Sequence, residues 1–549
     1  MVMVDRRAFT PFDIVREIWT HLELPPAALS SLSLPRGRGA ADGGASAPGQ
    51  IRPVVPSSFK IGHLAQGTIA LSALGAAVVA HSALSSSRNT ASSSSSTSSS
   101  SSSSPRVTVP LRHATLEFRC ERLYTLAGKP PVESWGPIGG LHPTADGGHV
   151  RIHDVFPHHR AGALALLGLP ASCVDRAAVS ERTRTWKAVE LETVAVEERG
   201  LAVYALRSFA EWDALPQARA QPAMPVNIRT VELPLADAAS LPPRRGDGDR
   251  DGNGNKRCLS GIRVLELSRV IAAPVAGKTL AAHGADVLWA TSPRLPDLPG
   301  LDREFARGKR SIRLDLHDNH DNNEEDDGDG ATLLKLARTA DVVIQGYRPG
   351  SLAARVPGVF DVAALARANP GVVVANLSAF APGGPWEERR GFDSLVQTCG
   401  GMNVAEAEAY AYGTEGEGQI GARALPCQAL DHGAGYLLAA GVCAALYRRE
   451  RDRAAGRRVG AYVVDVSLAG VLGYLRSLGQ FEGRSGFEEG KEMEEKGEGE
   501  GEDDALFETR ETAFGEMRFL RHSARVDGFE TGWDVMPGPL GSDEAVWKS

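Results

Sequence analysis

Strands and helices alternate along the C-terminal half of the chain, and this alternation constrains the fold more than any other feature. Short apolar runs typical of strands lie at 263–267, 286–289, 311–314, 341–344 and 372–377, and helical patterns fall between them at 275–283, 332–338 and 362–368. Strands that alternate with helices of this size form parallel βαβ units. The pattern therefore predicts an α/β fold with a doubly wound, Rossmann-like sheet. Ligands of such sheets bind beyond the carboxyl ends of the strands, so the loops 268–274 and 345–350 are candidate binding loops.

Low-complexity segments divide the chain. The Gly/Asp-rich segment 244–257 is typical of a linker, so we expect an N-terminal region, 1–243, and a C-terminal domain, 258–549. The Ser-rich tract 85–104 and the acidic runs 318–329 and 488–504 interrupt folded-looking sequence. Such compositions cannot bury enough apolar surface to fold on their own, and we interpret them as loop insertions.

Charge and cysteine content narrow the class of protein. The net charge is −8, but the two acidic runs carry −7 and −8, so the rest of the chain is net positive and can attract an anion. Nothing in the composition indicates a nucleic-acid-binding protein. The six cysteines show no CxxC spacing, which argues against a disulfide framework and fits a reducing compartment. Since residues 1–10 also lack the apolar core of a signal peptide, we expect a cytoplasmic protein, with the mitochondrion and the peroxisome left open.

Two local sequence patterns resemble a membrane span and a phosphate-binding loop but do not meet the requirements of either. Residues 64–80 are uncharged, but they are rich in Ala and Gly and shorter than a membrane span, so we expect a buried helix and no membrane partner. The sequence 273–279 ends in GKT, yet a phosphate-binding P-loop needs glycine where Ala272 stands. We therefore interpret Lys278 as a surface residue of an Ala-rich helix.

Five sequence segments occur in a fixed order in the C-terminal half. They are GIRVLELSRVIAAPVAGKTLAAHGADVLW (261–289), RGKRSIRLDL (307–316), ADVVIQGYRPGSL (340–352), NPGVVVANLSAFAPGGPW (369–386) and RRGFDSLVQTCGG (389–401). This series resembles the family III (CaiB/BaiF-like) CoA-transferases, the group related to formyl-CoA transferase, carnitine CoA-transferase and α-methylacyl-CoA racemase. The resemblance continues through 424–449 and 463–470. It implies acyl-CoA and a carboxylic acid as substrates, with no tightly bound cofactor and no metal.

The resemblance implies that Asp431, in the stretch ALDHGAG, is the catalytic carboxylate. Acyl transfer from a thioester to an acid can proceed through a covalent acyl-aspartate, and a carboxylate is favoured at the start of a helix. Asp is also a common N-cap before such a run. The residue pattern alone leaves both roles open, and the motif context favours catalysis.

The resemblance also implies which residues contact CoA. They are Val270, Ile271 and Ala272 in the first loop, Leu314 on the third strand, Gly346, Tyr347 and Arg348 after the fourth strand, and Arg390. The guanidinium groups suit phosphate, which they can bind bidentately. This chain has Ser292 where some members of the family have Arg, so the phosphate contacts are expected to differ there.

A second departure from the family pattern distinguishes CoA transfer from acyl-CoA racemisation. The racemases use a His in a G-H-D motif as an acid/base group, and the matching segment here is Gly391-Phe392-Asp393. Phe cannot carry a proton, so CoA transfer is favoured over an acyl-CoA racemase or isomerase activity. His432, beside Asp431, is a less suitable substitute. A CoA-binding protein without catalytic activity is the third alternative.

The N-terminal region carries family features in another order. Residues 59–80 resemble the helix after Asp431, and 107–114 resemble 464–469; this alignment places His63 opposite Asp431, so the first half has no catalytic Asp. Residues 144–168 look like the family's smaller α+β domain. We interpret the cluster His153, His158 and His159 as polar loop histidines rather than metal ligands. The chain is thus expected to be a fusion of two partly duplicated halves that pair within one chain or in a homodimer.

Overall fold

The computed structural model describes residues 4–36, 52–91, 104–233, 256–316, 328–352, 355–412, 421–496 and 504–548. The sequence-based expectations for 92–103, 244–255, 318–327 and 497–503 lie outside the described residues.

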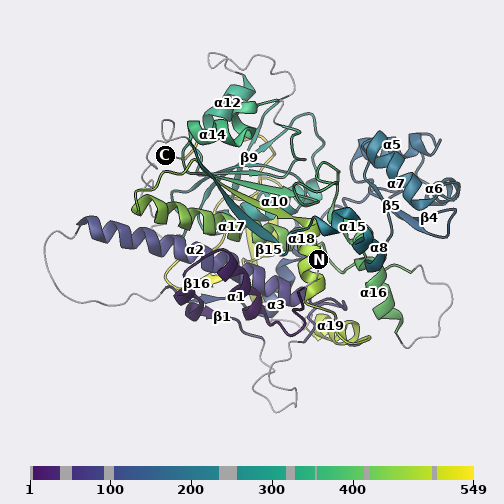
Figure 1. Cartoon of the computed structure of the whole chain (residues 1–549), viewed down its shortest axis with the longest axis horizontal. Helices are drawn as coiled ribbons and strands as arrows, with labels where there is room; N and C mark the ends of the chain where they lie inside the picture. Colours follow the sequence, from purple (N-terminus) through teal and green to yellow (C-terminus); the bar gives the residue numbers. More distant parts are fainter. Residues whose placement is uncertain are drawn as a thin grey trace, which may run out of the picture.

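A seven-stranded sheet forms the centre of the molecule (Figure 1). In spatial order its strands are β10 (Lys309–Arg313), β9 (Asp286–Thr291), β8 (Arg263–Leu267), β11 (Val342–Gln345), β12 (Val372–Ser378), β13 (Ala461–Ser467) and β7 (Val226–Val231). The first six strands are parallel. The chain moves outward from β8 through β9 to β10 and then continues on the other side of β8 at β11, so the strand order reverses between β8 and β11. A crevice for ligands opens at the carboxyl ends of the strands at such a point.

The five strands and three helices expected from the periodicity are confirmed. The helices are α10 (Ala272–Ala282), α12 (Asp329–Ala337) and α14 (Val362–Ala368), with α11 (Pro299–Phe305) and α13 (Pro357–Phe360) as shorter additions. The strands are almost entirely buried, as parallel strands covered on both faces must be.

One strand of this sheet comes from the N-terminal region. The expectation that the whole sheet follows residue 258 is wrong for β7, which pairs antiparallel with β13 from Val226 opposite Val466 to Val231 opposite Ala461. The half-exposed pattern of β7 is that of an edge strand. Six residues of this kind carry too weak a local signal to show which sheet they join.

Two long helices from opposite halves pack side by side (Figure 1). They are α2 (Ile61–Ala91) and α17 (Ala429–Ala454). Leu64 contacts Gly433, and a Cβ added at Gly75 would lie 2.9 Å from Cβ of Cys443, so the helices run parallel and close together. Both are long and apolar enough to cross a membrane, but their apolar windows are entirely buried in the protein. The prediction of a buried helix over 64–80 is confirmed.

A smaller α+β unit lies to one side of the central sheet (Figure 1, right). Its antiparallel sheet contains β4 (Gly140–Pro143), β5 (His149–Ile152) and β6 (Val203–Ala205), covered by α5 (Pro157–Leu166), α6 (Arg176–Thr183) and α7 (Ala188–Thr193). Its apolar residues form a cluster of their own, which includes Ile152, Leu164 and Leu191. This is the small unit expected around 144–168.

The end of the chain returns to the N-terminal region. Strand β15 (Gly515–Leu520) pairs with β14 (Phe507–Thr512) and with β3 (Thr125–Leu126), while β16 (Arg525–Val526) pairs with β2 (Val107–Thr108), the neighbour of β1 (Leu32–Ser33). The remaining α-helices of the described part are α1 (Pro11–His21), α3 (Leu111–Glu117), α4 (Cys120–Leu123), α8 (Phe209–Ala214), α9 (Pro216–Arg219), α15 (Asp393–Cys399), α16 (Met402–Ala411), α18 (Leu468–Ser477) and α19 (Ser485–Lys496). The two halves are therefore interleaved by strand pairing.

Two further expectations are corrected. Lys278 is not at the surface: its side chain is 1% exposed, and Nζ lies 2.7 Å from Oε1 of the buried Glu304. A lysine can be buried in this way when it is paired with a carboxylate. The acidic run 488–504 is not wholly a loop, because α19 extends to Lys496 and buries Phe487 against the body of the protein. The composition of residues 488–504 alone did not indicate this contact, because Phe487 directly precedes the run.

Candidate active site

A cavity of about 440 Å³ opens where the parallel strands end. Leu267, Thr291, Leu314, Gly346 and Ser378, at or just beyond the ends of five strands, contribute to its wall. The first turns of α5, α10 and α17 complete it. The structure brings together in this wall all the site residues named from the sequence, which are Val270, Ile271, Ala272, Leu314, Gly346, Tyr347, Arg348, Arg390 and Asp431.

Asp431 is the third residue of α17, and it is 7% exposed in the cavity wall. The N-cap position of α17 is Gln428, and the helix start is instead capped by Asp393, whose Oδ2 accepts hydrogen bonds from the backbone N–H groups of Leu430 (2.8 Å) and Asp431 (2.9 Å). No hydrogen bond to the carboxylate of Asp431 occurs among the described residues. The capping role that the sequence left open for Asp431 therefore belongs to Asp393, and the Asp431 carboxylate is left available to a ligand.

Burial dominates the electrostatics of these two carboxyl groups. It raises the pKa of Asp431 well above its usual value, and the charges of Asp393 and Glu121 raise it further. Burial also raises the pKa of Asp393 to about 6, although hydrogen bonds from the backbone of Asp431 and from the Gln397 side chain oppose the rise. Asp393 lies within one of the family motifs, but the sequence assigned it no role. The motif RGFDSLVQ was the available signal, and only the fold shows that Asp393 meets α17.

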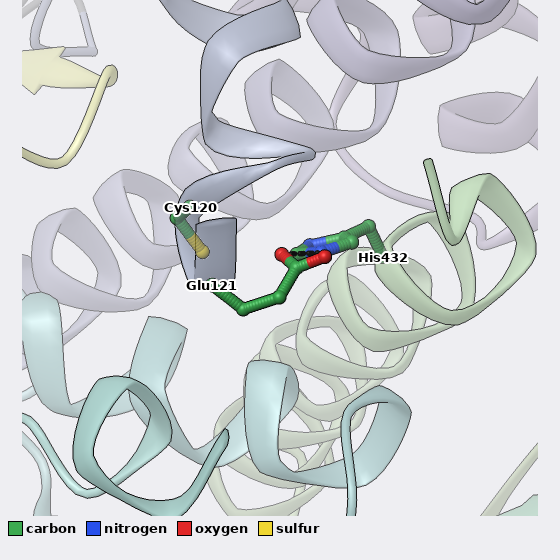
Figure 2. A group of neighbouring side chains, drawn as sticks. All are labelled: Cys120, Glu121 and His432. Atoms are coloured by element: carbon green, nitrogen blue, oxygen red, sulfur yellow. Dashed lines mark hydrogen bonds and ion pairs between the residues drawn. The ribbon is translucent and has the colours of Figure 1, made fainter. Parts of the chain in front are cut away.

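A buried group on the N-terminal side supports the start of α17. Nε2 of His432 lies 3.0 Å from Oε2 of Glu121, which α4 contributes (Figure 2). The His432 ring also stacks on Phe118. Cys120 lies beside this pair, with ligand-type atoms of all three residues within 4.8 Å of one another. The N-terminal region therefore reaches the residue next to Asp431.

The trio Cys120, Glu121 and His432 is poorly suited to a metal ion. Metal binding requires a thiolate, but burial raises the pKa of Cys120 well above its usual value. The ammonium group of Lys278 is 3.3 Å from Sγ of Cys120 and would repel a cation. We interpret the group as a structural hydrogen-bonded pair, Glu121 and His432, with a neighbouring thiol.

Basic side chains gather at the outer parts of the cavity. Arg269, Arg348 and Arg390 lie on the side of the small unit, and Arg390 donates a hydrogen bond to the carbonyl of Gly200. Ser292, the position where the family pattern is broken, also lines the cavity, and Arg294 two residues later contributes a guanidinium group. These cations suit the phosphates of a nucleotide ligand.

Phe392 lines the cavity and lies against His153, which does not line it. Its ring stacks on His153, with centroids 3.9 Å apart, and lies 5.6 Å from the ring of Phe156. His158 and His159, by contrast, line the cavity from α5. Of the three histidines interpreted as polar loop residues, His153 lies in a loop but is buried, and His158 and His159 lie in the first turn of α5, where His159 is buried against Phe156.

A second cavity of about 550 Å³ adjoins the first. It lies between residues 196–201 of the small unit and residues 384–390, and it shares Arg348, Glu387, Arg389 and Arg390 with the first cavity. Arg389 is paired there with Glu192 and Glu197. The small unit and the central sheet domain thus meet across two adjoining spaces.

His63, which the repeat alignment placed opposite Asp431, lies at the start of α2 and is buried against Phe481. The described residues that line the main cavity do not include His63.

Comparison with known proteins shows which protein family this chain resembles. Residues 259–499 match the model of CoA-transferase family III. An acyl-CoA transferase of Gibberella moniliformis is 33% identical over 247 residues, which cover 44% of this chain and 40% of that protein. The probable fatty acyl-CoA transferase Rv3272 of Mycobacterium tuberculosis is 34% identical over 224 residues, covering 38% of this chain and 52% of that protein.

A crystal structure of Rv3272 shares 30% sequence identity, covers 40% of this chain and 58% of its own, and superposes with a TM-score of 0.32. The chain spans about half the length of the curated relatives that it matches. The match of residues 259–499 to CoA-transferase family III confirms the resemblance found in the motifs.

Proposed function

We propose that the protein is a CoA-transferase that moves CoA from an acyl-CoA to a carboxylic acid, with Asp431 as the nucleophile. One observation carries the proposal: the buried Asp431 carboxylate, with no hydrogen-bond partner in the described part of the chain, shares one cavity with all eight residues expected to contact CoA. The names of the relatives, which are acyl-CoA and fatty acyl-CoA transferases, support the same reaction class.

The chemistry needs an ionised carboxylate and a site without water. An oxygen of Asp431 attacks the thioester carbonyl, the C–S bond breaks, and CoA leaves as the thiolate, so that the acyl group forms an anhydride with Asp431. The acceptor carboxylate then attacks the aspartyl carbonyl and displaces the donor acid. When the thiolate attacks the new anhydride, it forms the product acyl-CoA and regenerates Asp431. The buried position of Asp431 protects the anhydride from hydrolysis.

The arrangement of the sheet supports CoA as the ligand. Six strands are parallel and the cavity lies at the point where their order reverses, which supports the proposal of a doubly wound, Rossmann-like sheet with a ligand at that point. The first turn of α10, at Ala272, faces the same space and favours a negatively charged group. We therefore propose that the CoA phosphates lie among the outer arginines and that the thioester points inward to Asp431.

Racemisation is the weaker alternative. A racemase needs a second acid/base group opposite Asp431, and the position of the racemase His carries Phe392, whose ring is stacked on His153. Solvent deuterium should therefore not enter the α-position of a 2-methylacyl-CoA incubated with the protein, and rapid incorporation would support the racemase alternative.

The N-terminal region is proposed to complete the C-terminal domain. Leu64 meets Gly433 and Gly75 meets Cys443, which is nearly the correspondence expected if α2 is a partial duplicate of α17. Such a pairing within one chain can replace a contact between two subunits, and a homodimer stays an alternative. We also propose a cytoplasmic location, because all six cysteines are free thiols.

The test of this proposal compares the variant Asp431→Asn with the control variant Asp213→Asn. Asp213 is an exposed residue that pairs with Arg476. Pairs of acyl-CoA donors and acids are screened by mass spectrometry, and CoA binding is measured by calorimetry. We expect Asp431→Asn to lose transfer by on the order of 10³-fold or more while it still binds CoA, because only the covalent step is removed. Asp213→Asn should behave as the wild type. Transfer retained by Asp431→Asn would contradict the proposal.

A further inference from the structure

The first turn of α5 brings a histidine into the cavity that the mechanism above does not use. His159 is the third residue of α5 and 4% exposed, and it lines the same cavity as Asp431. Its Nδ1 is buried without a hydrogen-bond partner, and no hydrogen bond to either ring nitrogen occurs in the part of the chain that the structure describes. Buried polar atoms of proteins are nearly always paired, so an imidazole this buried with no partner among the described residues points to a ligand; Nε2, which unlike Nδ1 is not sealed from the cavity, is the nitrogen that can meet it.

The surroundings hold this imidazole in place and keep it neutral. Phe156 and Phe392 contact its ring edge to face, with centroids 6.3 and 6.4 Å away. Burial, together with the nearby charges of His158, Arg390 and Arg348, lowers the pKa of His159 to about 3. A neutral imidazole has one N–H donor and one acceptor nitrogen, so His159 can donate a hydrogen bond without adding a charge.

The same wall favours negative charge. Phe156, His158 and His159 form the start of α5, where no side chain caps the helix. Pro157 has no N–H and that of His159 donates to the Phe156 carbonyl, so the backbone N–H of His158 and the positive end of the helix dipole are what this turn offers. Arg348 and Arg390 lie near His159, as their effect on its pKa shows. All of these groups stabilise an anion in this part of the cavity.

Transfer of CoA between carboxylates involves no net proton transfer. What each step needs is a hydrogen-bond donor for the oxygen on which negative charge develops, when a carboxylate or a thiolate attacks a carbonyl carbon. Among the residues that line the cavity with Asp431, His159 combines a buried position, a rigid ring and a donor without a protein partner.

We propose that His159, contributed by the N-terminal region, is a catalytic residue that donates a hydrogen bond to the acyl oxygen while Asp431 forms and breaks its anhydride. The inference rests on the proposed function, since the oxygen in question is that of the acyl group attacked by Asp431. It assigns a catalytic role to the small unit, and it makes both halves of the chain part of one active site.

The groups that face His159 determine its pH behaviour. They are His158 on its own helix, His153 behind the aromatic rings, and Arg348 and Arg390 from the central domain. All of them disfavour the imidazolium form, so a donor role for neutral His159 gives no titration of its own between pH 6 and 9. A role as general base would instead add a limb to the pH profile that disappears in a His159 variant.

The experiment uses the full chain with three variants: His159→Leu, which removes the donor; His159→Gln, which keeps an N–H donor; and His149→Gln, a control on β5 in the same small unit. Single-turnover formation of the Asp431 anhydride is followed by rapid quench and mass spectrometry, and CoA binding is measured by calorimetry. We expect His159→Leu to slow this step by roughly 10²–10³-fold, as the loss of one such donor does elsewhere. CoA affinity should stay within about threefold of the wild type.

His159→Gln should recover part of the rate, and His149→Gln should match the wild type. A His159→Leu rate within about threefold of the wild type, equal losses of rate and CoA affinity, or a pH limb that vanishes in His159→Gln would each overturn the inference. These outcomes are distinct from failure of the proposed function, which would show as transfer that survives Asp431→Asn or as a wild type that transfers no CoA. Imidazole ¹⁵N shifts of the wild type on addition of CoA give a readout without turnover, and a His159 signal that does not move would also count against the inference.

Discussion

Asp393 is expected to hold the start of α17, and with it Asp431, through two backbone hydrogen bonds. The comparison of Asp393→Ala with Asp393→Asn tests them: both variants lose the oxygen that accepts from Gln397, but Asn keeps an oxygen that can accept from Leu430 and Asp431 while Ala keeps none. The carboxylate is 1% exposed, so water cannot easily replace it. A buried donor left unpaired costs about 1–3 kcal/mol, and two cost about 2–6 kcal/mol. Asp393→Ala should be less stable than Asp393→Asn by this amount.

The assay is urea unfolding followed by tryptophan fluorescence, together with hydrogen exchange of peptides from the first turns of α17. Asp393→Ala should unfold at lower urea and exchange faster at the start of α17, with exchange in α12 as the internal control. Equal unfolding midpoints and equal exchange in the two variants would refute the argument that these hydrogen bonds position Asp431.

The pH dependence of stability, compared between the wild type and Asp393→Asn, gives an independent check on the role of Asp393. The pKa of Asp393 is raised to about 6 in the folded protein from 3.8. A carboxyl group with a raised folded pKa binds more protons in the folded state, so its contribution to stability is present below about pH 4 and is lost as the pH rises through about 6. Asn does not titrate. The wild type should therefore lose stability relative to Asp393→Asn between pH 4 and pH 7, and a constant difference would contradict the assignment.

Three further outcomes are expected. Glu121→Gln removes a charge that raises the pKa of Asp431, so the acid limb of the pH profile of CoA transfer should move to lower pH; an unmoved limb would show that the two groups are not coupled. Gly75→Ala places a Cβ 2.9 Å from that of Cys443 and should destabilise the protein by about 1–3 kcal/mol in a denaturant titration, with partial recovery when Cys443→Gly is added. The fragment 258–549, which lacks the helix that covers α17, should be poorly soluble or inactive, and co-expression of the N-terminal region should restore it; a fully active, monodisperse fragment would show that the first half is an independent module.

The sequence by itself determined the elements of the central sheet and the composition of the cavity wall. Apolar runs such as 263–267 and 372–377 are buried on both faces, and this burial appears directly as an uninterrupted apolar pattern. Loops that follow parallel strands must meet at one edge of the sheet. For this reason residues as distant in sequence as Ile271 and Arg348 could be expected to share one site before any coordinates were known.

Only the tertiary structure decided how the two halves are joined and what surrounds Asp431. The capping of α17 by Asp393 spans 38 residues, the pairing of Glu121 with His432 spans 311, and that of Lys278 with Glu304 spans 26. Each of these polar groups is buried only because a specific partner compensates its desolvation. Local periodicity carries no information about such partners, since a buried charge and an exposed one occupy the same kind of position in a sequence. The chain therefore showed which residues meet at the strand ends, and the packing of α2, α4 and α5 against the central domain decided that the N-terminal region reaches the same site.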